Sequence, residues 1–109
     1  MNQTKKEKIL AEAKAKFPKA WFKDGAEFNG GSAVLWSGEG SEVNNGCPAF
    51  DSTGCQEYLM IDVCEEFGVE YKPSNTYEFG VHKDLVEFAD EHGLFWEAYD
   101  GGTYFAYEV

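Results

Sequence analysis

The chain has 109 residues, 43% of them hydrophobic, with 9 Phe, 6 Tyr and 3 Trp, which is enough for one compact domain with its own core over residues 1–109. No apolar run approaches the roughly 20 residues that cross a bilayer, and the lysine-rich start lacks the apolar stretch of a signal peptide, so we expect a cytoplasmic protein. The formal net charge of −11 disfavours direct binding to nucleic acid or to an anionic membrane.

The charge is divided unevenly along the chain. Residues 1–23 hold seven lysines against two glutamates, or +5, whereas residues 24–109 hold two lysines against eighteen acids, or −16. There is no arginine, so most carboxylates of the body, residues 20–109, have no basic side chain to pair with. A field of this sign and size favours basic partners.

Residues 4–17 are predicted to form a basic N-terminal helix. Thr4 followed three residues later by Glu7 fits a capping box, and Pro18 ends the helix. Its apolar stripe is Ile9, Leu10, Ala13 and Phe17. The lysines of this helix could form an arm for nucleic acid or membrane, or a solvated face of a helix that docks on the acidic body. We favour the docked helix, because the body would repel the same polyanion.

Two segments follow this helix. Residues 26–28 and 33–36 are predicted to form a first hairpin across Asn29-Gly30-Gly31. Residues 38–51 are irregular and predict either an exposed functional loop or a connector. The sequence Gly38-Glu39-Gly40 is not a phosphate loop, because it lacks the lysine and the following helix that a phosphate cradle uses.

A second helix is predicted over residues 53–67. Thr53 and Gln56 fit a capping box, and Gly68 ends the helix. The apolar stripe Leu59, Val63 and Phe67 is expected to be buried, with Met60 and Cys64 beside it. An alternative interpretation is that residues 55–67 are partly extended, since Val and Ile also have high propensity for β-strands.

Short strands are expected next, at residues 69–72 and 76–79, around the turn sequence Pro73-Ser74-Asn75. The last third of the chain has the densest signals. Its helix carries one apolar stripe, which consists of Val81, Leu85, Phe88, Ala89 and His92, and Gly93 ends it. Residues 94–99 and 103–109 then predict a hairpin across Asp100-Gly101-Gly102. The fold class is therefore α+β, a single small domain in which two hairpins and short strands form a mostly antiparallel sheet, covered on one face by about three helices.

No residue pattern predicts catalysis or a cofactor. The soft metal ligands are Cys47, Cys55, Cys64, His82 and His92, and their spacing does not match the paired ligands of zinc sites. Cys64 is expected in the core and His92 near a helix C-terminus. Cys47 has no nearby cation to favour its thiolate, so we expect no cysteine nucleophile. The eighteen acids are spread over the body, so no pair of them is assigned as catalytic. We therefore expect no metal and no enzyme activity. The odd number of cysteines in a cytoplasmic chain also predicts that no disulfide is needed for folding.

Two hypotheses of function remain. In the first, the acidic face imitates a polyanion and occupies the basic nucleic-acid-binding groove of another protein, as a DNA-mimic inhibitor does. The composition is similar to that of small acidic phage-encoded inhibitors of restriction and CRISPR systems, although no shared motif identifies a family. In the second, the chain is an ordinary acidic accessory or small-ligand-binding domain whose charge serves solubility.

The first hypothesis predicts a partner-binding set of acids around the third helix and its neighbours. These residues close the second helix, flank the short strands or share the outward side of the third helix. The predicted set is Glu65, Glu66, Glu70, Glu78, Asp84, Glu87, Asp90 and Glu91.

Overall fold

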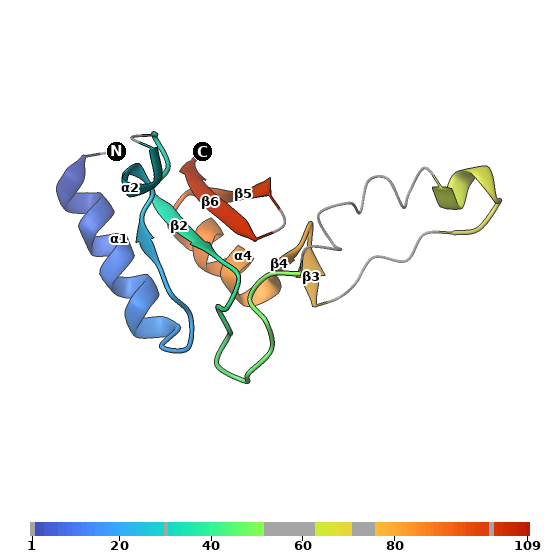
Figure 1. Ribbon diagram of the computed structural model, residues 1–109, viewed down its shortest axis with the longest axis horizontal. Coiled ribbons are helices and arrows are strands. Elements are labelled where there is room, and N and C mark those ends of the chain that lie inside the picture. Colours follow the sequence, from blue (N-terminus) through green and yellow to red (C-terminus); the bar gives the residue numbers. More distant parts are fainter. Residues whose placement is uncertain (1, 30, 52–62, 71–75, 101) are drawn as a thin grey trace.

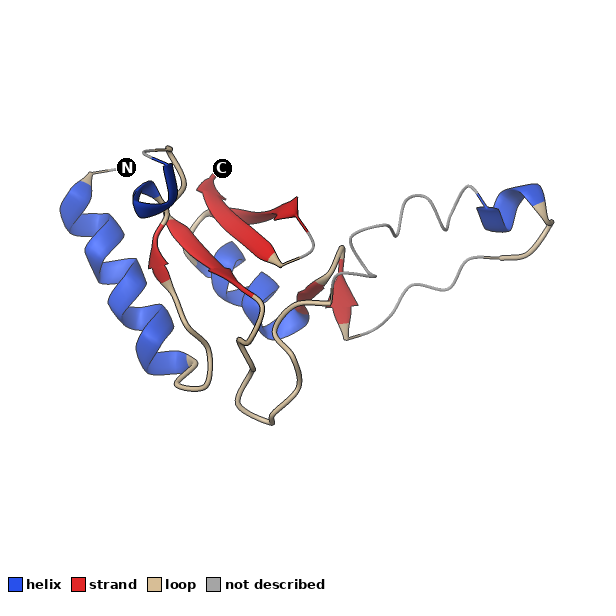
Figure 2. Ribbon diagram, viewed as in Figure 1, coloured by secondary structure: helices blue, strands red, loops and turns tan. Residues whose placement is uncertain are grey.

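The computed structural model describes residues 2–29, 31–51, 63–70, 76–100 and 102–109. Its helices are α1 (Gln3–Lys16), α2 (Ala26–Asn29) and α4 (Lys83–Glu91), and residues 63–66 are also helical. Its strands are β1 (Lys23–Asp24), β2 (Leu35–Gly38), β3 (Tyr77–Glu78), β4 (Val81–His82), β5 (Leu94–Asp100) and β6 (Thr103–Glu108). The α+β fold is confirmed, with an antiparallel sheet in the order β1-β2-β6-β5 and a separate β3-β4 pair (Figures 1 and 2).

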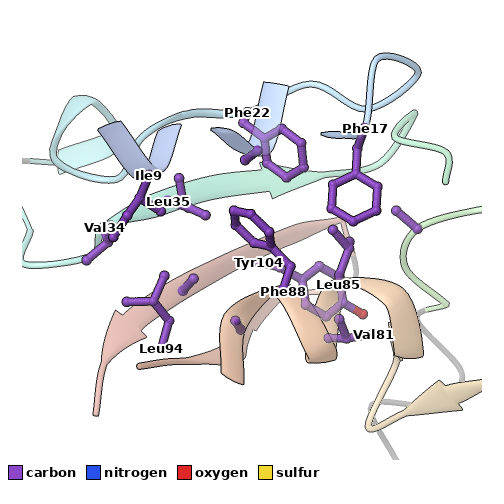
Figure 3. Close-up of a cluster of buried hydrophobic side chains, with 14 of the residues drawn as sticks. Ile9, Phe17, Phe22, Val34, Leu35, Val81, Leu85, Phe88, Leu94 and Tyr104 are labelled. Carbon is purple, nitrogen blue, oxygen red and sulfur yellow. The ribbon is translucent and has the colours of Figure 1, made fainter. Parts of the chain in front are cut away.

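The core lies on one face of the four-stranded sheet. The strand register places Leu35 beside Ala106, so both side chains point to the same face, where α1 and α4 pack. Phe17, the C-cap of α1, meets Phe88 of α4 edge to face, with ring centroids 5.9 Å apart, and Tyr104 lies beside them (Figure 3). The two helices therefore close one apolar core against the sheet.

Helix α1 docks on the body as expected, but Thr4 does not cap it. Asn2 is the N-cap, and its side-chain oxygen accepts from the Lys5 N–H at 2.8 Å, so the helix begins at Gln3. Three residues of its apolar stripe, Ile9, Ala13 and Phe17, are buried. The Lys6 ammonium lies 3.0 Å from the Asp24 carboxylate in a mostly shielded pair that fastens α1 to β1.

The first predicted hairpin is wrong in its first arm, because residues 26–29 form the short helix α2. The Asp24 carboxylate accepts from the Ala26 N–H at 2.9 Å and so caps this helical turn. Its pKa lies below the ordinary 3.8 because of that hydrogen bond and because of Lys6 and Gln3, which outweigh desolvation. A Cβ atom on Gly25 would lie 2.3 Å from the Ala33 carbonyl oxygen, so glycine lets β1 approach β2.

The predicted second helix lies mostly outside the described residues. Residues 63–66 are helical, and Gly68 ends the helix with a φ of 69°. The expected burial is wrong for Val63 and Phe67, whose exposed fractions are 42% and 75%, and Cys64 does not belong to the core. The physical reason is position, because this segment lies apart from the sheet and its helices (Figure 1).

The strands expected beside Pro73 do not pair with each other within the described residues. The Val69 N–H donates to the Cys64 carbonyl oxygen at 2.8 Å and so caps the end of the helix. Neither Val69 nor Glu70 belongs to a strand. The second strand is present as β3, but it pairs with β4 across a turn at Phe79 and Gly80. Both turn residues have positive φ, 48° and 86°, which is the requirement of a type I′ hairpin.

This turn also moves the start of the third helix. Val81 and His82 belong to β4, and α4 begins at Lys83, because the His82 ring nitrogen accepts from the Asp84 N–H at 3.1 Å and caps the helix. The predicted helix end is confirmed: His92 is the C-cap and Gly93 has a φ of 68°.

The C-terminal hairpin is also confirmed. Strands β5 and β6 pair antiparallel from Leu94 with Glu108 to Asp100 with Thr103. Tyr99 is the extra residue of a bulge, which ends the regular part of β5 at Ala98. The Asp100 carboxylate accepts from the Gly102 N–H at 2.8 Å and helps to hold the turn.

Candidate functional site: an acid-rimmed groove beside β5

A cavity of about 640 Å³ opens between α4, strand β5 and the β3–β4 turn. We call it the β5 groove. It is lined by Glu78, Phe79, Val81, Val86, Ala89, Asp90, Leu94, Phe95, Trp96, Glu97 and Ala98.

The groove runs along the edge of the sheet. Residues 94–98 of β5 line it without interruption, although neighbouring residues of a strand point to opposite faces. A cavity that touches every one of them must lie beside the backbone of the strand. Strand β5 is the last strand of the sheet, and among the residues that the structure describes no strand pairs with its outer side.

Aromatic and aliphatic side chains form part of the groove walls, and one of the aromatic rings is held rigidly. The Trp96 indole N–H donates to the Leu85 carbonyl oxygen at 3.0 Å, and its ring lies 5.4 Å from the Phe50 ring, so this wall is held in place from two sides. Phe79 and Phe95 are 52% and 45% exposed. Large exposed aromatic side chains beside a groove are typical of binding sites.

Phe79 also holds an unfavourable backbone conformation. Its φ of 48° lies in the left-handed region, which costs a residue with a Cβ roughly 1–2 kcal/mol. Glycine or asparagine is the usual residue at such a turn position. The chain thus keeps an aromatic side chain at the end of the groove where the turn itself would favour a smaller residue, and strain of this kind is often found at functional positions.

The rim of the groove is anionic. Three exposed carboxylates, those of Glu78, Asp90 and Glu97, belong to its lining, and no lining residue is basic. Glu87 is exposed on α4, one helical turn before Asp90. The groove therefore combines aromatic and aliphatic side chains with negative charge.

The structure brings together only part of the predicted acidic set. Glu78 and Asp90 line the groove and Glu87 lies near it. Glu91 lies on the other side of α4, 3.8 Å from the Lys16 ammonium, and Asp84 lies 3.8 Å from the His82 ring. The remaining three acids, Glu65, Glu66 and Glu70, are exposed on the 63–70 segment and do not line the groove.

Sequence reasoning missed Glu97, Phe79 and Phe95 as site residues. Glu97 lies within a strand of alternating character, and only the strand order shows that this strand is an edge. A signal for Phe79 was present in the sequence, since Phe79-Gly80 has the length of a two-residue hairpin turn and contains a glycine.

The other groups with chemical potential are separated from one another. Among residues 2–29, 31–51, 63–70, 76–100 and 102–109, no three His, Cys, Asp or Glu side chains meet at a possible metal site. Cys47 and Cys64 are free thiols, whereas Cys55 lies outside the described residues. His92 lies at the helix end as expected, with its Nε2 atom 3.1 Å from Glu12 of α1.

Two further observations bear on the class of protein. No helix in the described part of the chain is long and apolar enough to pass through a membrane. Comparison with protein-family models, with curated proteins and with solved structures finds no match.

Proposed function

We propose that this chain is a non-catalytic acidic binding protein that occupies a basic, nucleic-acid-binding surface of another protein, as a DNA-mimic inhibitor. The observation that carries the proposal is the β5 groove, in which three exposed carboxylates lie among aromatic and aliphatic side chains and no basic residue is present. Acids alone would serve solubility equally well. Acids around an exposed aromatic groove have the composition of an interface, because apolar anchors give most of the binding energy and rim charges select the partner.

The distribution of charge supports the same proposal. The lysines of the N-terminal segment belong mainly to α1, and the four-stranded sheet lies between α1 and the β3–β4 turn (Figure 1). Two of them, Lys6 and Lys16, pair with acids of the body. The lining of the groove thus carries negative charge and no basic side chain, and such a field speeds encounter with a basic surface and repels nucleic acid.

In this proposal the protein competes with nucleic acid for its partner. Carboxylates on a folded scaffold replace phosphates, and much of the cost of ordering them has already been met by folding. Glu65, Glu66 and Glu70 contribute to the net negative charge from an exposed segment outside the groove. Such an inhibitor works in the cytoplasm, and phage-encoded inhibitors of restriction or CRISPR systems are the nearest functional type.

A second candidate function is small-ligand binding. It is favoured by the size of the groove, because about 640 Å³ falls within the range of roughly 300–1,000 Å³ that is usual for ligand pockets. Salt separates the two functions. A complex held by the acidic rim weakens steeply as ionic strength rises, whereas a small ligand held in an apolar pocket does not respond in this way.

The experiment is capture followed by competition. The protein is immobilised, proteins that bind at low salt are identified, and each is tested for release of labelled DNA or RNA when the protein is added. The groove variant is the triple E87K/D90K/E97K, and the matched control is E65K/E66K/E70K, which changes the net charge by the same amount outside the groove.

We expect the wild type to displace the nucleic acid and the groove variant to lose this activity, since attraction becomes repulsion. The control variant should lose much less. Equal loss in both variants would mean that only net charge matters and that the groove is not the interface. Captured proteins that keep their nucleic acid in the presence of the wild type would contradict the mimic function.

A further inference from the structure

We propose that the outer edge of β5 binds an extended segment of a basic partner as an additional strand of the sheet, with alternating apolar and basic side chains in that segment. This inference deepens the proposed function and rests on it for the charge of the partner. It adds the mode of recognition, in which backbone hydrogen bonds give affinity and alternate side chains give specificity.

The hydrogen-bond pattern of β5 follows from its register. The Val109 N–H donates to the Gly93 carbonyl oxygen at 2.9 Å, immediately before the paired residues of β5 and β6 begin. In an antiparallel ladder, pairs that exchange hydrogen bonds alternate with pairs that do not. Counting from Gly93, the residues of β5 that bond to β6 are Phe95 and Glu97.

The residues that alternate with Phe95 and Glu97 along β5 must direct their backbone groups away from β6. The N–H and C=O groups of Leu94, Trp96 and Ala98 therefore face the outer edge of the sheet, where the groove lies. The register of β5 is regular from Leu94 to Ala98, and the bulge at Tyr99 ends it. The regular segment therefore contains three outward-facing residues. The groove thus offers three sets of strand hydrogen bonds in one row.

The two edges of the sheet are protected to different degrees. The other edge, β1, has only two residues, and one of them is Lys23, so it follows the usual protection of edges by short length and by lysine. Strand β5 has seven residues and contains neither lysine nor proline. The acids of β5, Glu97 and Asp100, disfavour pairing with an acidic strand, and the bulge at Tyr99 interrupts the edge after Ala98. Residues 94–98 remain a regular edge that can pair with a basic strand.

The side chains around this edge define the occupant. Val86 and Phe79 lie in the groove beside β5 and suit apolar side chains on one face of an added strand. Glu97 extends from the neighbouring strand, and opposite charges on adjacent strands are favourable, so the other face should carry lysine or arginine. A second copy of this chain does not fit, because its own edge would bring further acids, Glu97 and Asp100, to the same site.

The test uses a capped heptapeptide of alternating lysine and valine and the ¹⁵N-labelled full chain. We expect the amide protons of Leu94, Trp96 and Ala98 to exchange at least about tenfold more slowly at saturating peptide. The amides of Phe95 and Glu97 serve as internal controls, since their bonds to β6 exist without peptide. Their exchange should change much less.

Two methylated peptides sharpen the experiment. One carries N-methyl groups on every valine and the other on every lysine, so each peptide keeps its charge but loses the N–H donors of one edge. We expect one of the two to protect the three amides and the other to fail. Equal behaviour of both peptides would overturn strand addition.

The outcomes separate this inference from the proposed function. Peptide binding without protection of the three amides would overturn strand addition, while an acidic groove that binds a basic surface through side chains would remain. Absence of peptide binding at low salt would also overturn the inference. The proposed function fails by a different result, namely the absence of nucleic-acid displacement by the whole protein.

Discussion

Replacement of Phe79 by asparagine should separate stability from binding. Phe79 has a φ of 48°, and asparagine adopts this left-handed conformation more readily than other residues with a Cβ. The substitution relieves strain in the β3–β4 turn and at the same time removes an aromatic wall of the β5 groove.

The two effects on stability nearly cancel. Relief of the left-handed conformation contributes at most about 1–2 kcal/mol. Full burial of a phenylalanine side chain contributes about 1.5–3 kcal/mol, but Phe79 is 52% exposed, so roughly half of that contribution is lost. We expect F79N to change the free energy of unfolding by less than about 1 kcal/mol. Loss of an aromatic anchor typically weakens binding by more than about 1 kcal/mol, or at least about fivefold.

Urea unfolding followed by circular dichroism gives the stability, and titration with the alternating lysine and valine heptapeptide gives the affinity. The control is F67N, which removes an exposed aromatic side chain outside the groove and should leave the affinity unchanged. A loss of several kcal/mol of stability in F79N would mean that asparagine does not relieve strain in the β3–β4 turn. Unchanged peptide affinity would refute the role of Phe79 in the groove.

Three further predictions concern the fold. F88A should lose about 3–5 kcal/mol in urea unfolding, because Phe88 is 2% exposed at the contact between α1 and α4, and a loss below 1 kcal/mol would contradict that packing. G25A should lose about 1–3 kcal/mol, since its new Cβ would meet the Ala33 carbonyl oxygen, and unchanged stability would mean that β1 and β2 can separate freely. The folded-state pKa of Asp24 is lowered, so its contribution to stability is present above pH 3.8 and disappears as the pH falls through the folded-state pKa. D24N should therefore lose less stability on acidification than the wild type. Parallel profiles of stability against pH for the two proteins would disprove this.

Local patterns predicted much of the fold. The apolar stripe of α1, the glycine that ends α4 and the turn between β5 and β6 each depend on a few neighbouring residues, and each prediction is confirmed. The first hairpin failed because Asp24 caps a helical turn, which a search for Asn-Gly-Gly turns does not consider. The buried stripe at Val63 and Phe67 failed because periodicity shows amphipathicity without showing what the apolar face contacts.

The candidate site was harder to predict than the fold. The sequence placed Glu78 and Asp90 among the binding acids, and both line the groove. Glu97 could not be chosen, because its role depends on β5 being the last strand, and strand order is a property of long-range pairing. The edge itself likewise has no local signature.

Whether the acidic groove is the interface is decided by the dependence of partner affinity on salt, measured for the wild type and for E87K/D90K/E97K. If the acidic groove binds a basic surface, the affinity of the wild type falls steeply as ionic strength rises, and the groove variant binds more weakly with a shallower dependence. An affinity that does not change with salt, or an equal dependence in both proteins, would contradict the claim.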